Sequence, residues 1–270
     1  MKLKLAGISR QTEFSPNHVL NDFLIINKTA EELQKLGCEV KMYDESVLMQ
    51  GLIEEQFIFS MVQGLIGSKT LLKVAENKKL VINSPQSVIN CYRYNMVKLL
   101  PGNGIPFPES RIVTTNNGIE LEDIKQKVWL KRGDAHAVHK EDVSLVYSMN
   151  EMETMLKEFH RRGITSAIIQ KHLIGDTVKF YAIRETDFFY WYHLNGEYHT
   201  KFDEAKLIEL ADRSAETLGL YIYGGDAIIT PESEIIIIDI NDWPSFAPVR
   251  DKASQLIANL IYRKVEEYES

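Results

Sequence analysis

The residues best suited to chemistry lie near the end of the sequence, in a stretch that reads YIYGGDAIITPESEIIIIDINDWPSF. Two apolar, β-branched runs, residues 227–230 and 235–238, flank a Pro-Glu-Ser-Glu turn, which predicts a buried antiparallel hairpin. Asp226 precedes the first run, Asp239 follows the second, and Asn241 stands two residues further on. Because a hairpin brings the start of its first strand beside the end of its second, we expect these three side chains to converge.

Two carboxylates and an amide oxygen at one place suit Mg2+, which takes a few protein oxygens and keeps waters and substrate phosphates in its remaining positions. The simpler alternative is that Asp226 and Asn241 only end strands and begin turns, as acids and amides commonly do. The presence of both acids at one end of the same hairpin favours the metal site. Four consecutive isoleucines before Asp239 indicate a strand covered on both faces, which would give that carboxylate a rigid support.

The first third of the chain contains the elements of a domain that precedes this hairpin. Apolar strand patterns alternate with amphipathic helices, giving strands at 2–8, 39–43, 57–62 and 80–83 and helices at 18–36 and 68–77. Such alternation predicts a small, mostly parallel α/β domain. No glycine fingerprint of the dinucleotide-binding or P-loop type accompanies it.

The middle of the chain carries a second group of charged candidates. Strand 128–131 delivers Lys131 at its end into the loop RGDAHA, where a lysine beside small residues can approach a phosphate; a solvated lysine is the simpler alternative. Helix 87–100 carries Arg93, and a turn is predicted at Asn116-Asn117-Gly118. The remaining predicted elements are helices 151–162, 205–218 and 252–268 and strands 167–170, 177–184 and 187–193.

Length and composition limit the classes of function. The 270 residues, 44% of them hydrophobic, are enough for one large domain or two to three small ones. The net charge of -7 argues against a general nucleic-acid or anionic-membrane binder. Two cysteines without metal or redox spacing, and no signal-peptide pattern or membrane-length apolar run, lead us to expect a soluble cytoplasmic protein.

The order of the motifs is similar to that of a known family. The chain carries INSPQSVINCYRYNMVKLL, GIPFPES, VWLKRGDAHA, IIQKHLIGDTVKFYAIR, GLYIYGGDAII and IIIIDINDWPSF, in that order. This succession resembles the ATP-grasp superfamily, in particular the branch with glutathione synthetases, ribosomal-protein glutamate ligases and D-alanine:D-alanine ligases. The resemblance implies an α/β (α+β) ATP-grasp fold, with an N-terminal parallel α/β domain at 1–84 and an ATP-grasp domain at 85–270. Its α+β subdomains, 85–172 and 173–270, would clamp the nucleotide.

The resemblance also implies roles for individual residues. Asp226, Asp239 and Asn241 match the family's metal-binding acid, acid and asparagine, for one or two Mg2+ or for Mn2+. The implied nucleotide-binding set comprises two phosphate-contacting cations, a hinge that reads the adenine edge and an acid for the ribose hydroxyls: Arg93, Lys131, Gln170, Lys171, His172, Leu173 and Asp176. Lys179 and Arg184 are the catalytic candidates, facing the transferring phosphoryl group or the carboxylate, unless they are charges on a solvent face.

Three features depart from the family's pattern. Asp239 stands where a glutamate is usual, and Arg93 stands where a lysine is usual, with Lys98 as the other choice for that role. Arginine keeps the charge but presents a planar fork. The loop after the strand-end lysine has Gly133 where many relatives carry several glycines that cover the phosphates with backbone N–H groups, and His136 would donate a hydrogen bond there instead.

The function that the resemblance implies is an ATP- and Mg2+-dependent carboxylate–amine ligase that works through an acyl phosphate. Its partners would be a small-molecule or peptide carboxylate and an amine nucleophile, without nucleic acid or membrane, and a homodimer is one expected assembly. One alternative is a small-molecule kinase of the inositol polyphosphate kinase type, although the acidic composition does not favour a polyphosphate substrate. The other is a nucleotide-binding protein with weak or no catalysis, suggested by the glycine-poor loop.

Overall fold

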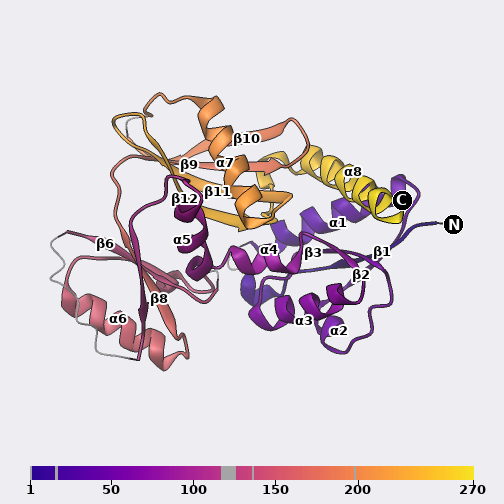
Figure 1. Cartoon of the computed structure of the whole chain (residues 1–270), viewed down its shortest axis with the longest axis horizontal. Helices are drawn as coiled ribbons and strands as arrows, with labels where there is room; N and C mark the ends of the chain where they lie inside the picture. The colour runs from indigo at the N-terminus through magenta and orange to yellow at the C-terminus, as the bar shows by residue number, and fades with distance from the viewer. Residues whose placement is uncertain (1, 16–17, 117–125, 136, 198) are drawn as a thin grey trace.

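The computed structural model describes residues 2–15, 18–116, 126–135, 137–197 and 199–270. The predicted turn at Asn116-Asn117-Gly118 and the side chain of His136 therefore lie wholly or partly outside the described residues. Three four-stranded sheets, with helices packed against them, form the molecule (Figure 1). Among the helices described, none is both long and apolar enough to cross a membrane.

The first sheet is parallel and has the strand order β2-β1-β3-β4, which confirms the predicted α/β unit. Its apolar strands are buried between helices on both faces, as parallel sheets require. The elements are β1 (Lys4–Ile8), β2 (Glu39–Tyr43), β3 (Phe57–Ser60), β4 (Leu80–Ile82), α1 (Val19–Lys35), α2 (Glu45–Met49) and α3 (Leu65–Glu76), with a 3-10 turn at Thr12–Phe14.

The second sheet is antiparallel, in the order β5-β8-β6-β7, and α6 packs against it through Met152, Leu156 and Phe159. Two of its strands, β5 and β7, were not predicted, because each is short and only partly buried and lacks a clear alternation. The elements are β5 (Ser110–Thr114), β6 (Val128–Arg132), β7 (Val143–Val146), β8 (Ser166–Lys171) and α6 (Met149–Arg161), with a 3-10 turn at Lys140–Asp142.

The third sheet, also antiparallel, contains the predicted hairpin and has the order β10-β9-β11-β12. The hairpin strands are longer than predicted, so Asp226, Asp239 and Asn241 lie inside them and not at their ends. Three aromatic side chains of β9 and β10 are buried in its core: Phe180, Tyr181 and Phe188. The elements are β9 (Asp176–Ile183), β10 (Phe188–Asn195), β11 (Ile222–Ile229), β12 (Ile235–Asp242) and α7 (Glu204–Leu218).

The helix predicted at 87–100 is two helices, α4 (Pro85–Asn90) and α5 (Arg93–Gly102). Tyr92 interrupts the helix with an extended backbone, φ -64° and ψ 135°. Its hydroxyl donates to the main-chain oxygen of Gln63 at 2.8 Å, in the connection after β3. This anchor in the first sheet fixes where α5, and therefore Arg93, begins.

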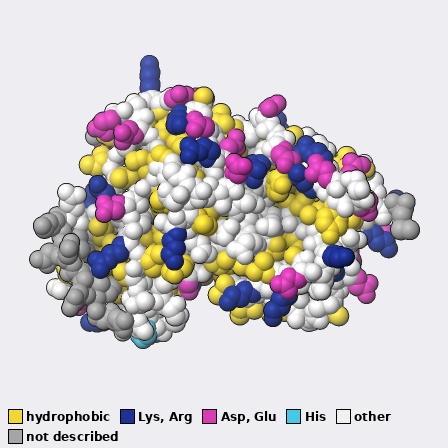
Figure 2. Space-filling view, in the orientation of Figure 1, with side chains coloured by type: hydrophobic (Ala, Val, Ile, Leu, Met, Phe, Trp, Pro, Cys, Tyr) yellow, Lys and Arg dark blue, Asp and Glu magenta, His cyan; other side chains and the backbone are white. Residues whose placement is uncertain are grey.

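The first and third sheets share one core, which also includes α8 (Arg250–Glu269), reached through a 3-10 turn at Ala247–Val249. Helix α8 packs along α1, and Figure 1 shows the two side by side. The sheets lie within residues 4–82, 110–171 and 176–242, one in each predicted division, while the division limits themselves stay a prediction. On the face drawn in Figure 2, acidic and basic side chains are interspersed over the described surface.

Candidate functional site

The strand register brings the predicted acids together. Asp226 on β11 lies opposite Asp239 on β12, and on its other side it lies opposite Lys179 on β9. Directly opposed residues point to the same face of a sheet, as do residues two apart in one strand, so Asn241 shares that face. The pairing shifts between Asp226 and Ala227, which marks a bulge next to the acids.

Cations surround the two carboxylates. Lys179 Nζ lies 2.8 Å from Asp226 Oδ1, and Arg93 Nη2 lies 3.5 Å from Asp239 Oδ2. Burial raises the pKa of Asp226 above its ordinary value, although the Lys179 ammonium opposes that shift. The Nε and Nη1 atoms of Arg93 are buried and have no hydrogen-bond partner among the described residues. This guanidinium therefore has donors left for an anionic ligand.

Lys131 lies in β6, next to the last residue of the strand and beside this cluster, and a side chain of β8 holds it in place. Its Nζ donates to Gln170 Oε1 at 2.7 Å, and Gln170 Nε2 donates in turn to Ser110 Oγ at 3.0 Å. Burial, and then the nearby charge of Arg93, lower the pKa of Lys131 to about 8. The ammonium therefore loses its proton more readily than that of an ordinary lysine, and a bound anion would oppose this loss.

A cavity of about 420 Å³ opens between the second and third sheets. It combines an apolar wall, which includes the indole of Trp129, with the cations and carboxylates described above. Among its lining residues are Arg93, Trp129, Lys131, Gln170, Lys171, His172, Leu173, Asp226 and Asp239. The segment predicted to be the hinge thus lines one cavity together with both acids.

A second cavity, of about 550 Å³, lies between the first and third sheets. Lys179 and Asn241 line it, and Arg93 lines both cavities. Its wall also carries the phenol-bearing side chains of Tyr181 and Tyr192. Arg93 therefore stands where the two cavities meet, next to the opposed acids.

Hydrogen bonds from the first sheet fix the corner that follows Asn241. Arg10 donates from Nε to the Met61 oxygen at 3.1 Å and from Nη2 to the Trp243 oxygen at 3.0 Å, while Nη1 pairs with Asp22 at 2.8 Å. These bonds use all three guanidinium nitrogens within the protein. Arg10 thus acts as a bridge between the sheets, although it lines the larger cavity.

Asn83 forms the second bridge to that corner. Its Nδ2 donates to Asp242 Oδ1 at 2.6 Å and to the Ile222 oxygen at 2.7 Å, and its Oδ1 accepts from the backbone nitrogen of Tyr221 at 2.9 Å. Burial raises the pKa of Asp242 to about 6. Sequence reasoning missed Asn83, because its partners lie more than a hundred residues away. Trp129 was also missed, but its position two residues before Lys131 on a strand placed it on the same face.

Three predicted candidates do not reach either cavity. Asp176 is fully buried, and its Oδ2 accepts from the backbone nitrogen of Thr200 at 2.7 Å. Arg184 donates to the Leu220 oxygen at 3.2 Å and lies over the ring of Tyr221. Lys98, the other choice for a phosphate cation, lies over the ring of Tyr94. The structure therefore favours Arg93 over Lys98, and Lys179 over Arg184, as the cations beside the acids.

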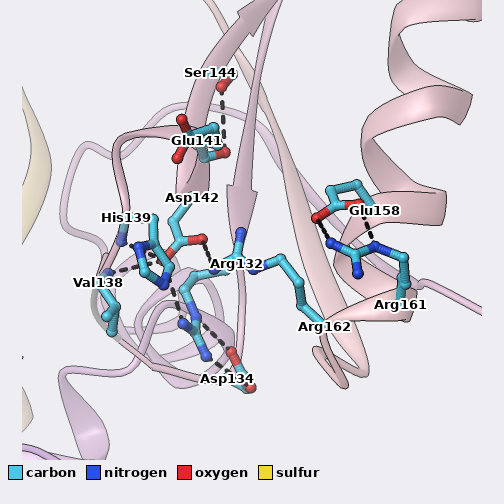
Figure 3. A network of polar contacts seen from close by, with 10 residues as sticks. All are labelled: Arg132, Asp134, Val138, His139, Glu141, Asp142, Ser144, Glu158, Arg161 and Arg162. Carbon is cyan, nitrogen blue, oxygen red and sulfur yellow. Dashed lines mark hydrogen bonds and ion pairs between the residues drawn. The ribbon is translucent and has the colours of Figure 1, made fainter. Parts of the chain in front are cut away.

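A polar network holds the loop after Lys131 (Figure 3). Asp142, which is fully buried, pairs with Arg132 at 3.2 Å and with Arg162 at 2.7 Å. Ala137 of this loop lines the larger cavity, and Val143, at the start of β7, lines the smaller one. The described part of the loop thus borders the larger cavity, and the strand that follows it borders the smaller one.

Within the described residues, no three His, Cys, Asp or Glu side chains gather closely enough to hold a metal ion by themselves. Two opposed carboxylates and an amide remain, in a setting rich in cations. Such a partial set of oxygen ligands fits an ion that completes its shell with water and phosphate oxygens, as Mg2+ does.

Comparison with known proteins identifies the fold. No family model and no curated protein matches the sequence. Solved structures do match: a D-alanine–D-alanine ligase from Bacillus anthracis complexed with ATP superposes with a TM-score of 0.73 at 13% identity, covering 99% of each chain. The chain has the ATP-grasp fold.

Two further solved structures are similar to this chain. A RimK domain ATP-grasp protein from Sphaerobacter thermophilus gives a TM-score of 0.72 at 18% identity, covering 96% of this chain and 99% of that one. The VanG D-Ala:D-Ser ligase from Enterococcus faecalis gives 0.70 at 14% identity, covering 97% and 99%. The predicted fold class is thereby confirmed.

Proposed function

We propose that this chain is an ATP- and Mg2+-dependent carboxylate–amine ligase that forms an acyl phosphate. The observation that carries the proposal is the position of Arg93, whose two unpartnered nitrogens lie where the cavities meet, beside the opposed Asp226 and Asp239. A phosphoryl group that passes from one cavity to the other would pass this guanidinium. The neighbouring ligase structures, one of them complexed with ATP, support the same reading.

The smaller cavity is assigned to the nucleotide. The backbone of Lys171, His172 and Leu173 would face the adenine edge, with Trp129 on the apolar wall. Lys131 and Arg93 would neutralise the phosphates at the inner end. Asp226, Asp239 and Asn241 would hold Mg2+, which, when bound, would neutralise the charge of the phosphates.

The larger cavity is assigned to the acid and the amine. A carboxylate oxygen of the acid attacks the γ-phosphorus, the bond from that phosphorus to the ADP oxygen breaks, and ADP leaves. Lys179 and Arg93 stabilise the negative charge during this transfer, because both lie beside the reacting groups in a largely buried setting. The product is a mixed anhydride of the acid and phosphate.

The amine then attacks the acyl carbon. The new carbon–nitrogen bond forms, the bond from carbon to the phosphate oxygen breaks, and the nitrogen gives up a proton as inorganic phosphate leaves. The side chains of the chain do no covalent chemistry in either step. Their role is to position the reactants, to balance charge and to keep water away from the anhydride.

A hydroxylamine trap tests the proposal. With Mg2+, ATP and a panel of acids, including peptides, hydroxylamine should convert the anhydride to a hydroxamate, with ADP and phosphate formed in equal amounts. A kinase would instead leave the γ-phosphate on a stable alcohol, without hydroxamate or free phosphate, and that result would overturn the ligase assignment. Binding of ATP without turnover of any acid or alcohol would support the nucleotide-binding alternative.

A further inference from the structure

The loop between β6 and β7, residues 133–142, of which the structure describes all but residue 136, runs beside the site proposed for the phosphates. Lys131 precedes it, Ala137 lines the larger cavity, and Val143, which follows it, lines the smaller one. Only one glycine, Gly133, stands in this loop. We therefore ask which side chains hold the described part of this loop in its conformation.

Asp142 fixes the C-terminal half of the loop. Its Oδ2 accepts hydrogen bonds from the backbone nitrogens of Val138, at 2.8 Å, and of His139, at 3.0 Å, directly after Ala137 (Figure 3). Arg132 and Arg162 both pair with the same carboxylate, which is fully buried. One side chain thus joins the loop backbone to β6 and to the segment after α6.

Polar contacts also hold the N-terminal half of the loop. Arg132 makes a second, two-pronged contact with Asp134, at 2.9 and 3.2 Å. The backbone nitrogen of Gly133 donates to the Ser166 oxygen at 2.9 Å, and its oxygen accepts from the Tyr94 nitrogen at 2.9 Å. A Cβ at position 133 would stand 2.9 Å from Ser166 Oγ, so this close approach to β8 needs glycine. Contacts therefore hold the backbone on both sides of Ala137.

The carboxylate at the centre of this network is ionised. Burial by itself would raise the pKa of Asp142, but the hydrogen bonds from His139 and Val138 and the charges of Arg162 and Arg132 outweigh it, so the pKa lies below its ordinary value. A buried carboxylate with two guanidinium partners and two backbone donors gives a strong, directional anchor.

We propose that Asp142 is a positioning residue that holds this loop against the terminal phosphates of the nucleotide, in place of a glycine-rich loop that the nucleotide itself would have to order. The inference rests on the proposed nucleotide function of the smaller cavity. A loop already fixed loses less conformational freedom when the phosphates bind, which favours affinity for the triphosphate. Binding of the nucleoside end, assigned to residues 170–173, should not depend on Asp142.

Asp142→Asn and Arg162→Gln test this role, with Glu158→Gln as the matched control. Glu158 makes an exposed ion pair with Arg161 on α6, close to the network but not part of it (Figure 3). For each folded protein, two quantities are measured: the exchange rates of the Val138 and His139 amide hydrogens without ligand, and the affinities for ATP with Mg2+ and for AMP.

In Asp142→Asn we expect faster exchange of both amides and an affinity for ATP about tenfold lower, because charge-assisted hydrogen bonds are lost, with AMP binding unchanged. Arg162→Gln should change the amide exchange rates and the ATP affinity in the same direction, but by less. If Asp142→Asn does not fold, Arg162→Gln provides the test, because Asp142 keeps its hydrogen bonds to the loop backbone in that variant. Glu158→Gln should match the wild type.

Equal losses for ATP and AMP would overturn the proposal, because Asp142 would then support the whole fold. Faster exchange with unchanged ATP affinity would also overturn it, since the loop would not touch the phosphates. The proposal is also overturned if the wild-type protein binds ATP no more tightly than AMP. If the wild-type protein binds neither nucleotide, the proposed function itself is overturned. The exchange rates of the Val138 and His139 amides then still show whether Asp142 anchors the loop.

Discussion

The two opposed acids differ in their surroundings, although both are candidates for one metal ion. Asp226 has Lys179 at 2.8 Å, whereas Asp239 has Arg93 at 3.5 Å, in a contact that leaves most of the guanidinium donors unused. The sequence predicted their convergence because a tight turn fixes which residues of a hairpin face each other. It could not predict their cationic partners, which come from β9 and α5.

We expect Asp226→Asn and Asp239→Asn each to lower Mg2+-dependent ATP turnover by about a hundredfold while the protein stays folded, since each removes a proposed, charged metal ligand without changing side-chain shape. Turnover against Mg2+ concentration, together with circular dichroism, checks this. Glu232→Gln is the control, because Glu232 is exposed in the turn of the same hairpin. Turnover in both variants equal to that of the control would exclude the metal assignment.

Lys131 should make nucleotide binding depend on pH. Its pKa of about 8 means that the ammonium is present below pH 8 and lost above it, so the phosphates lose a positive partner as the pH rises. In buffer without divalent metal, we expect ATP affinity to fall about tenfold between pH 7 and pH 9. Lys131→Arg keeps its charge over this range and should remove most of the fall in titration calorimetry. The same pH dependence in both proteins would contradict the role of Lys131.

At the scale of elements, the interruption between α4 and α5 explains how Arg93 is placed. The hydrogen bond from Tyr92 to Gln63 spans 29 residues of sequence and joins the start of α5 to the end of β3. Helical periodicity continues through residues 87–100, so the sequence predicted one helix. A long-range hydrogen bond of this kind leaves no local pattern. The hairpin, with its apolar runs, and α7, with its regularly spaced apolar residues, were predicted because their patterns are local.

Tyr92→Phe should destabilise the protein by about 1–2 kcal/mol, because the buried Gln63 oxygen loses its donor. Tyr94→Phe, two residues later, is the matched control, since Tyr94 is exposed and its ring can still contact Lys98. Urea denaturation of both variants measures the difference in the free energy of unfolding. Equal stability of the two variants would show that the tyrosine hydroxyl does not fix the start of α5.

For the whole molecule, one buried acid that lines neither proposed cavity should shape the pH dependence of stability. Glu45 is 4% exposed and lies against Gly67 of α3; burial, and then the charge of Glu13, raise its pKa to about 7. Because the pKa of Glu45 is higher in the folded state, its protonation stabilises the fold, and this contribution to stability is complete below the ordinary pKa of 4.5. It is lost as the pH rises to about 7.

We therefore expect Glu45→Gln to raise the free energy of unfolding at pH 8 by roughly 1–2 kcal/mol and to leave it unchanged at pH 4. Chemical denaturation at both values measures the effect, with Glu54→Gln at an exposed position as the control. A gain that is the same at pH 4 and pH 8 would mean that packing, and not ionisation, is responsible.

The order of motifs was enough to predict the fold of the whole molecule, because each motif comes from one continuous segment. The way the sheets are joined was not predictable from such segments. Arg10 and Asn83 connect the first sheet to the corner at residues 242–243, and a core shared by the first and third sheets closes the same interface. These contacts link residues that are distant in sequence, and they shape the larger cavity.

The packing of α8 on α1 has a consequence for the synthesis of the chain. Ile25, Ile26 and Leu33 of α1 share a core with Ile257 and Ile261 of α8, so α1 is translated well before the helix that covers it. Until residues 250–269 have left the ribosome, we expect that apolar face of α1 to stay uncovered and open to chaperones. Ribosome-bound chains stalled before residue 250 should therefore be cut by protease within the first sheet, whereas chains with α8 outside the ribosome should resist.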